Sequence, residues 1–176
     1  MLNKGSIGKG AIFLYIEAIN LMFSSYIFWL ILTQITSPSV IGSSSTIISL
    51  ASIFMVVASV GIPGGIQKFL GKNLSENNIA NIKGHINTSL LVTIFGIVGT
   101  TMVILILKDW IYEVFKIEYS LILIMILIVG FSSFSALLRS IIIPTLKIKI
   151  ITVTSVLATT IKILAAVILI LIGTEV

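Results

Sequence analysis

The chain has 176 residues, of which 57% are hydrophobic and only 10% are charged, and its mean hydropathy is +1.22. Soluble domains carry about 25% charged residues, so this composition excludes a soluble globular domain. The formal net charge of +5 comes without any aromatic-basic patch, which argues against nucleic-acid binding, and the absence of cysteine excludes disulfides and thiolate metal sites. The composition therefore predicts an all-α polytopic membrane protein with about five transmembrane helices in a single domain over residues 1–176.

The first predicted transmembrane helix covers residues 10–33 and contains an acid, Glu17. About 20 apolar residues cross the hydrocarbon core, so this segment is long enough. A charged side chain at such a depth costs about 2.5–3.5 kcal/mol on insertion scales, so Glu17 is expected to face a partner or a watery cavity. Asn20 and Ser24 follow at helical spacing and share its face. We predict that these three residues line a polar cavity.

The second predicted span, residues 41–62, carries a stripe of small residues, which favours close helix packing over a cavity lining. The members of this stripe are Ser45, Ser49, Ser52 and Ser59. A glycine-rich break over residues 61–65 ends the span. Residues 66–72 are then predicted as a short interfacial segment with Lys68 and Lys72 on one face. Lys68 is a candidate contact for a lipid head group.

Three more spans are predicted over residues 85–107, 120–143 and 151–172. His85, the only histidine, is interpreted as a polar residue at a helix start. Arg139 lies near the inner end of the fourth span, where topology alone would explain it, and is a second candidate head-group contact. Trp110 and Tyr112 follow the third span and are expected at head-group level.

The fifth span contains a lysine, Lys162, near its centre, and Thr159 lies on the same flank. Lys162 and Glu17 are the only ionisable residues deep within predicted spans. Two interpretations stay open. Lys162 attracts an anionic head group inside a cavity that Thr159 also lines, or it forms a structural ion pair with Glu17 or extends toward the interface.

Placing the N-terminus in the cytoplasm and the C-terminus outside puts eight basic residues inside and two outside. The inner group is Lys4, Lys9, Lys68, Lys72, Lys83, Arg139, Lys147 and Lys149; the outer group is Lys108 and Lys116. This distribution follows the positive-inside rule. It predicts a multi-pass protein of the cytoplasmic membrane in this orientation.

An enzyme is not expected, and neither is a cofactor or a metal. The chain has one aspartate, one histidine and no cysteine, and its acids are scattered. It contains no aspartate-rich metal motif, phosphate-cradling loop or Ser/His/Asp constellation.

The order of features over residues 4–72 resembles the start of polysaccharide-export flippases. The features are a Lys-Gly lead, a first helix with a polar face and a serine-rich second helix. The sharpest piece is the segment from Val60 to Gly71, VGIPGGIQKFLG. The family is the multidrug/oligosaccharidyl-lipid/polysaccharide superfamily, which includes MATE-like exporters, and the rest of the chain resembles it loosely.

This resemblance implies a transporter of lipid-linked sugar pyrophosphates that works by alternating access between two six-helix lobes. Lys162, and with it Arg139, would then engage the pyrophosphate, and the polar face of the first helix would line the cavity or couple to an ion. Family members have twelve to fourteen helices, and five helices cannot rock one lobe against another. We therefore expect a truncated part of a longer protein, with membrane lipids and a missing C-terminal lobe or partner membrane protein as its partners.

The competing interpretation is a small non-transporting membrane subunit or a homo-oligomeric helical scaffold. Its polar stripes would pair helix to helix, with no accessible cavity between them.

Overall fold

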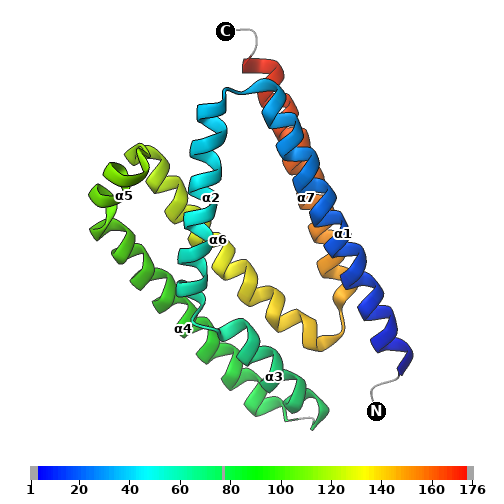
Figure 1. Ribbon diagram of the computed structural model, residues 1–176. Coiled ribbons are helices and arrows are strands. Elements are labelled where there is room, and N and C mark those ends of the chain that lie inside the picture. Colours follow the sequence, from blue (N-terminus) through cyan, green and yellow to red (C-terminus); the bar gives the residue numbers. More distant parts are fainter. Residues whose placement is uncertain (1–3, 77, 174–176) are drawn as a thin grey trace. The chain divides into compact units, whose positions relative to one another are not determined.

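A computed structural model of the protein describes residues 4–76 and 78–173, and throughout these ranges the regular structure is helical, with no strand. Five helices are long and apolar enough to cross a membrane, which confirms the predicted all-α, multi-pass class. They are α1 (Lys4–Ile35), α2 (Pro38–Ser59), α4 (Ile79–Ile106), α6 (Tyr119–Ile142) and α7 (Ile148–Gly173). Two shorter helices, α3 (Ile62–Ser75) and α5 (Lys108–Phe115), and a 3₁₀ turn, η1 (Ile143–Thr145), complete the described elements (Figure 1).

The described helices form two compact units. The first unit comprises the described parts of residues 1–41 and 146–176 and consists mainly of α1 and α7. The second unit comprises residues 42–145 and contains most of α2, all of α3 to α6, and η1.

In the first unit, α1 and α7 run parallel to each other. The Thr152 hydroxyl donates to the Phe13 carbonyl at 3.2 Å, and the Asn20 amide donates to the Thr159 hydroxyl at 3.1 Å. Both bonds join residues 139 positions apart, so the register is constant along the pair. Two parallel spans must have an odd number of spans between them, which agrees with the three that separate α1 from α7.

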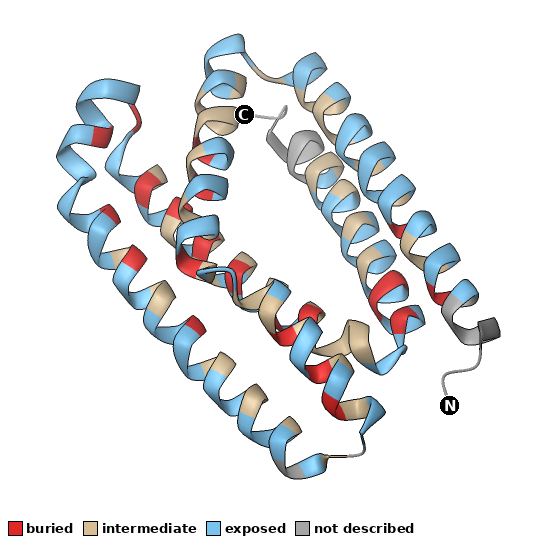
Figure 2. Cartoon of the chain, turned by 60° about the horizontal axis from the view of Figure 1, so that its bottom comes forward, coloured by how far each residue is buried: buried red, intermediate tan, exposed pale blue. Residues whose placement is uncertain are grey.

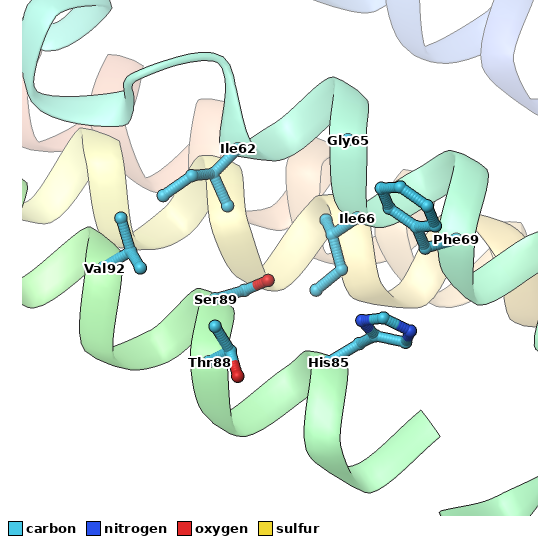
Figure 3. Close-up of a pocket in the computed structure, with 8 residues that line it drawn as sticks. All are labelled: Ile62, Gly65, Ile66, Phe69, His85, Thr88, Ser89 and Val92. Carbon is cyan, nitrogen blue, oxygen red and sulfur yellow. The ribbon is translucent and has the colours of Figure 1, made fainter. Parts of the chain in front are cut away.

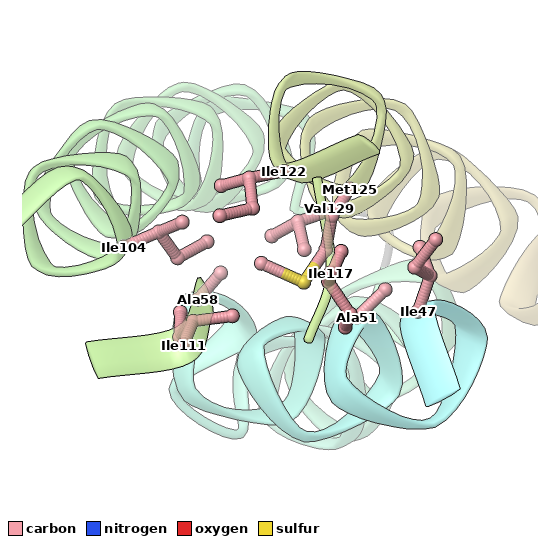
Figure 4. Packing of buried hydrophobic residues seen from close by; sticks show 9 residues of the cluster. All are labelled: Ile47, Ala51, Ala58, Ile104, Ile111, Ile117, Ile122, Met125 and Val129. Carbon is pink, nitrogen blue, oxygen red and sulfur yellow. The ribbon is translucent and has the colours of Figure 1, made fainter. Parts of the chain in front are cut away.

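The second unit is built around one buried stripe of α6, with successive members three or four residues apart, as expected for a helix that packs along one face. The stripe is Ile122, Met125, Val129, Ser133, Leu137 and Ser140. Its first half meets apolar residues of α2, α4 and α5 in the main core (Figure 4). The other members of this core are Ile47, Ala51, Ala58, Ile104, Ile111 and Ile117.

Helix α2 crosses α4 at a point where only glycine fits. A Cβ atom added at Gly96 would clash with the Ala58 carbonyl oxygen, whereas one added at Gly99 would meet nothing within 4 Å. Small residues permit this close backbone approach between helices in lipid. The serine stripe of α2 does not make the contact, since Ser49 and Ser52 are exposed and Ser52 hydrogen bonds to the carbonyl of Ser49 in its own helix.

The chain bends between α2 and α3 through two residues with positive φ, Val60 at 46° and Gly61 at 70°. Helix α3 then starts at Ile62, with Pro63 in its first turn, where a missing amide proton costs little. Gly64 and Gly65 therefore lie inside α3, and the predicted interfacial segment 66–72 is the middle of this longer helix. Its buried residues Ile66 and Leu70 pack against Leu137 of α6.

Aromatic residues gather around α5 and the start of α6. The rings of Tyr112 and Tyr119 stack at 4.9 Å, Trp110 meets Phe115 edge-on at 6.0 Å, and the Tyr119 hydroxyl donates to Asp109 at 3.0 Å. Amphipathic rings of this kind are enriched at membrane–water interfaces, so this end of the second unit has the composition of an interfacial belt.

The spanning helices expose most of their large apolar side chains (Figure 2). Met22 on α1 is 73% exposed and Phe95 on α4 is 72% exposed. Such surfaces are stable in hydrocarbon and unstable in water. The architecture is that of a multi-pass membrane protein.

Candidate functional site

The polar residues predicted on α1 and α7 meet at the interface of the first unit. Glu17 is completely buried, and Asn20 and Ser24 are half-buried on the same helix. Asn20 is joined directly to Thr159 by the 3.1 Å hydrogen bond. We call this row of four residues the α1–α7 seam.

Thr159 serves both helices at once. Its hydroxyl accepts the Asn20 amide proton and donates to carbonyls of its own helix, with Ser155 at 3.0 Å and Val156 at 2.9 Å. Side-chain amides and hydroxyls that bond across helices in this way stabilise helix pairs in lipid by about 0.6 kcal/mol on average. The seam therefore acts as a polar contact between the two helices.

Lys162 is exposed and lies beyond the seam, with its ammonium nitrogen 4.0 Å from the centroid of the Phe28 ring. A cation over an aromatic face at this distance gains about 0.5–2 kcal/mol, depending on how far it is desolvated. The register puts Glu17 level with Val156, six residues before Lys162, and six residues correspond to about 9 Å along a helix. The two charged groups are thus offset along the pair.

Arg139 and Lys68 belong to the second unit, whereas the other five predicted site residues belong to the first. Arg139 is half-buried in the last turn of α6, and Lys68 is exposed on α3. Arg139 and Lys68 were grouped as candidate head-group contacts only because both side chains are positively charged.

A second site lies between α3 and α4, where eight residues surround a pocket of about 240 Å³ (Figure 3). Four come from α3 and four from the first half of α4: Ile62, Gly65, Ile66 and Phe69, and His85, Thr88, Ser89 and Val92. The His85 and Phe69 rings stack at a centroid distance of 5.4 Å and an interplanar angle of 17°. We call this site the α3–α4 groove.

Sequence reasoning treated His85 as an ordinary helix-start residue and did not place Phe69 in any site. Their meeting depends on the bend at Val60 and Gly61, after which α3 runs antiparallel along the first half of α4. The sequence did indicate that α3 packs on another helix, because the predicted interfacial segment with Lys68 and Lys72 also has an apolar face, and such a face is expected to be covered.

No protein-family model, curated protein or solved structure matches the chain. Its function is therefore inferred from its own residues.

Proposed function

We propose that the chain is part of a membrane transporter similar to the flippases that move lipid-linked polysaccharide precursors across the cytoplasmic membrane. The observation that carries this proposal is the α1–α7 seam with Lys162 beside it. An ionisable residue within a membrane span is costly, and such residues mark substrate or ion pathways. Glu17 is buried in one span and Lys162 lies near the middle of another.

In this proposal Lys162 attracts the pyrophosphate that links the sugar to its lipid carrier. Phe28 contacts the ammonium group through its ring face, and a charge-assisted hydrogen bond is stronger than such a contact, so an arriving anion can take the ammonium group over. Glu17, Asn20, Ser24 and Thr159 form the adjoining polar wall, and Arg139 and Lys68 are further candidate head-group contacts.

The first experiment measures the molecular mass of the native protein in membranes of the source organism. The protein is detected with an antibody against the segment between Lys72 and Lys83. A band two to three times the 19.0 kDa of this chain supports a two-lobed flippase, and transport is then measured in that product. A band at 19.0 kDa contradicts a self-contained flippase and favours a small membrane subunit.

Transport is measured in vesicles as the movement of a fluorescent polyprenyl-pyrophosphate saccharide from one leaflet to the other. Lys162→Gln is expected to slow transport at least fivefold, which corresponds to the loss of about 1 kcal/mol of attraction. Lys162→Arg should keep most of the rate because it keeps the charge. Lys116→Gln, in the loop before α6, is the matched control, and an equal effect of the two glutamines would argue against a substrate role for Lys162.

The second candidate function is a non-transporting helical scaffold or subunit, and the direct Asn20–Thr159 hydrogen bond favours it. The two candidates differ in water access. Single cysteines at positions 20 and 159 should react with a water-soluble thiol reagent from one side of the membrane if a cavity reaches the seam. They should stay unlabelled from both sides if the seam only packs, while an exposed cysteine at Ser75 reacts as the positive control.

A further inference from the structure

We propose that the α3–α4 groove binds one anionic phospholipid, with an acyl chain in its apolar part and the phosphate head group at Lys72, near the end of α3. This proposal is independent of transport and of the seam.

The groove is a fixed feature of the second unit. Helix α3 runs antiparallel to α4, since Ile62 lies beside Val92 at one end of the pocket and Phe69 stacks on His85 at the other (Figure 3). Ile66 and Leu70 hold α3 in place against α6. The pocket of about 240 Å³ therefore lies between two helices, one of which is also packed against α6.

The two ends of the groove differ in chemistry. Isoleucine and valine line the end near Ile62 and Val92. Toward the other end, Lys72 lies three residues after Phe69 on α3 and so shares its helix face, whereas Lys83, two residues before His85, lies on the opposite face of α4. Lys68 is next to Phe69, and all three lysines are exposed.

Charge at this end favours an anion. Between Ile62 and Val92 the only acid is Glu76, against three lysines. Each lysine near a membrane surface attracts anionic lipid by about 1 kcal/mol. A ligand that matches both ends has an apolar chain and a negative head, which is the structure of an anionic phospholipid.

The length of α3 agrees with an interfacial position. Its 14 residues extend about 21 Å, too short to cross the hydrocarbon core, and its lysines lie on the face opposite Ile66 and Leu70. Phe69 and Val92 are 52% and 41% exposed, so the groove opens toward the surroundings of the protein, where lipid is available. A soluble anion would use the lysines but would leave this apolar surface uncovered.

The test uses tryptophan fluorescence in reconstituted vesicles. Trp29 and Trp110 are replaced by phenylalanine, and Phe69→Trp places a reporter in the groove, with Val92→Trp as a second reporter at its other end. Phosphatidylglycerol or phosphatidylcholine with brominated acyl chains is then added to unlabelled phosphatidylcholine. Brominated phosphatidylglycerol should quench the groove reporters with at least fivefold preference, whereas Met102→Trp, exposed ten residues beyond Val92 on α4, should show no preference.

Two sets of variants test the charge of the lysines and the open space of the groove separately. Lys72→Gln should lower the preference for phosphatidylglycerol about fivefold, while Lys83→Gln, on the opposite face of α4, and Lys108→Gln should leave it unchanged. Gly65→Leu should fill the groove and reduce quenching of the Val92→Trp reporter by both lipids. Gly64→Leu is the matched control, since Gly64 neighbours Gly65 but does not line the groove, and a Cβ atom meets nothing within 4 Å at either position.

Three results would overturn the proposal. They are equal quenching of the groove reporters by the two lipids, a phosphatidylglycerol preference that survives replacement of Lys72, and equal effects of leucine at positions 64 and 65.

Discussion

Asn20 and Thr159 share one hydrogen bond, but removing one side chain does not have the same effect as removing the other, because the remaining side chains keep different hydrogen bonds. Without Asn20, the Thr159 hydroxyl still donates to carbonyls in its own helix. Without the Thr159 hydroxyl, the Asn20 amide loses its partner across the seam. A half-buried amide that loses its partner costs about 1–3 kcal/mol, whereas an average interhelical hydrogen bond in lipid contributes about 0.6 kcal/mol.

We therefore expect Thr159→Val to destabilise the protein more than Asn20→Leu does. Unfolding of the purified protein in mixed micelles by increasing sodium dodecyl sulfate measures the loss of stability in each variant. The double variant then gives the interaction energy between Asn20 and Thr159. A larger loss for Asn20→Leu would mean that Asn20 has another partner of greater importance.

Thr93 on α4 and Ser133 on α6 are buried, and neither hydroxyl has a hydrogen-bond partner among the described residues. Replacing an unpaired polar group by an apolar one of similar shape removes a desolvation cost. Thr93→Val and Ser133→Ala are expected to leave stability unchanged or to raise it by up to about 1 kcal/mol. Thr152→Val, which removes the bond to the Phe13 carbonyl, should lower stability in the same micelle assay and serves as the contrast.

At the scale of elements, the crossing of α2 over α4 depends on Gly96, which has no side chain at the point of contact. Gly96→Ala would bring a Cβ atom against the Ala58 carbonyl, so the helices must separate, and overpacking of this kind costs about 1–3 kcal/mol. Gly99→Ala, one turn further along α4, meets open space and should be neutral or slightly stabilising, since alanine favours helix. The melting temperatures of the two variants in detergent test this, and equal values would contradict the close crossing.

At the scale of the whole molecule, the parallel pairing of α1 and α7 determines which connections share a side of the membrane. The starts of both helices must lie on one side and the end of α1 on the other. The natural chain has no cysteine, so single cysteines can be introduced directly. Cysteines at Gly8 and Lys147 should react with an impermeant thiol reagent from the same side, and one at Ser37 from the opposite side.

The distribution of basic residues further predicts that the Gly8 and Lys147 side is cytoplasmic. Labelling of Gly8→Cys and Lys147→Cys from opposite sides would contradict the parallel pair. Labelling of both from outside would contradict only the orientation.

Much of the fold could be predicted because hydrophobic length is a local property. Five apolar segments of about 20 residues are visible in the sequence, and the five long helices follow them within a few residues at most ends. Two starts are exceptions, since α1 begins at Lys4 instead of residue 10 and α4 begins at Ile79 instead of residue 85. In α4 the polar segment after Asn78 continues the helix, and the Asn78 side chain accepts a bond from the Asn81 amide there.

The candidate sites were harder to predict because they depend on register between distant segments. Helical spacing grouped Glu17, Asn20 and Ser24 on one face, but it cannot show that Asn20 meets Thr159 or that Lys162 rests on Phe28. The α3–α4 groove also requires the left-handed turn at Val60, a β-branched residue for which sequence preferences predict the opposite sign of φ.

The 139-residue separation of Asn20 and Thr159 also sets an order of events during biosynthesis. A ribosome adds roughly 5–20 residues per second, so α1 leaves it on the order of ten seconds before its partner α7 exists. During that interval Glu17 and Asn20 have no α7 beside them, in the protein-conducting channel or in lipid. We therefore expect α1 to stay near the insertion machinery, or to be covered by another helix, until α7 arrives to cover its polar face.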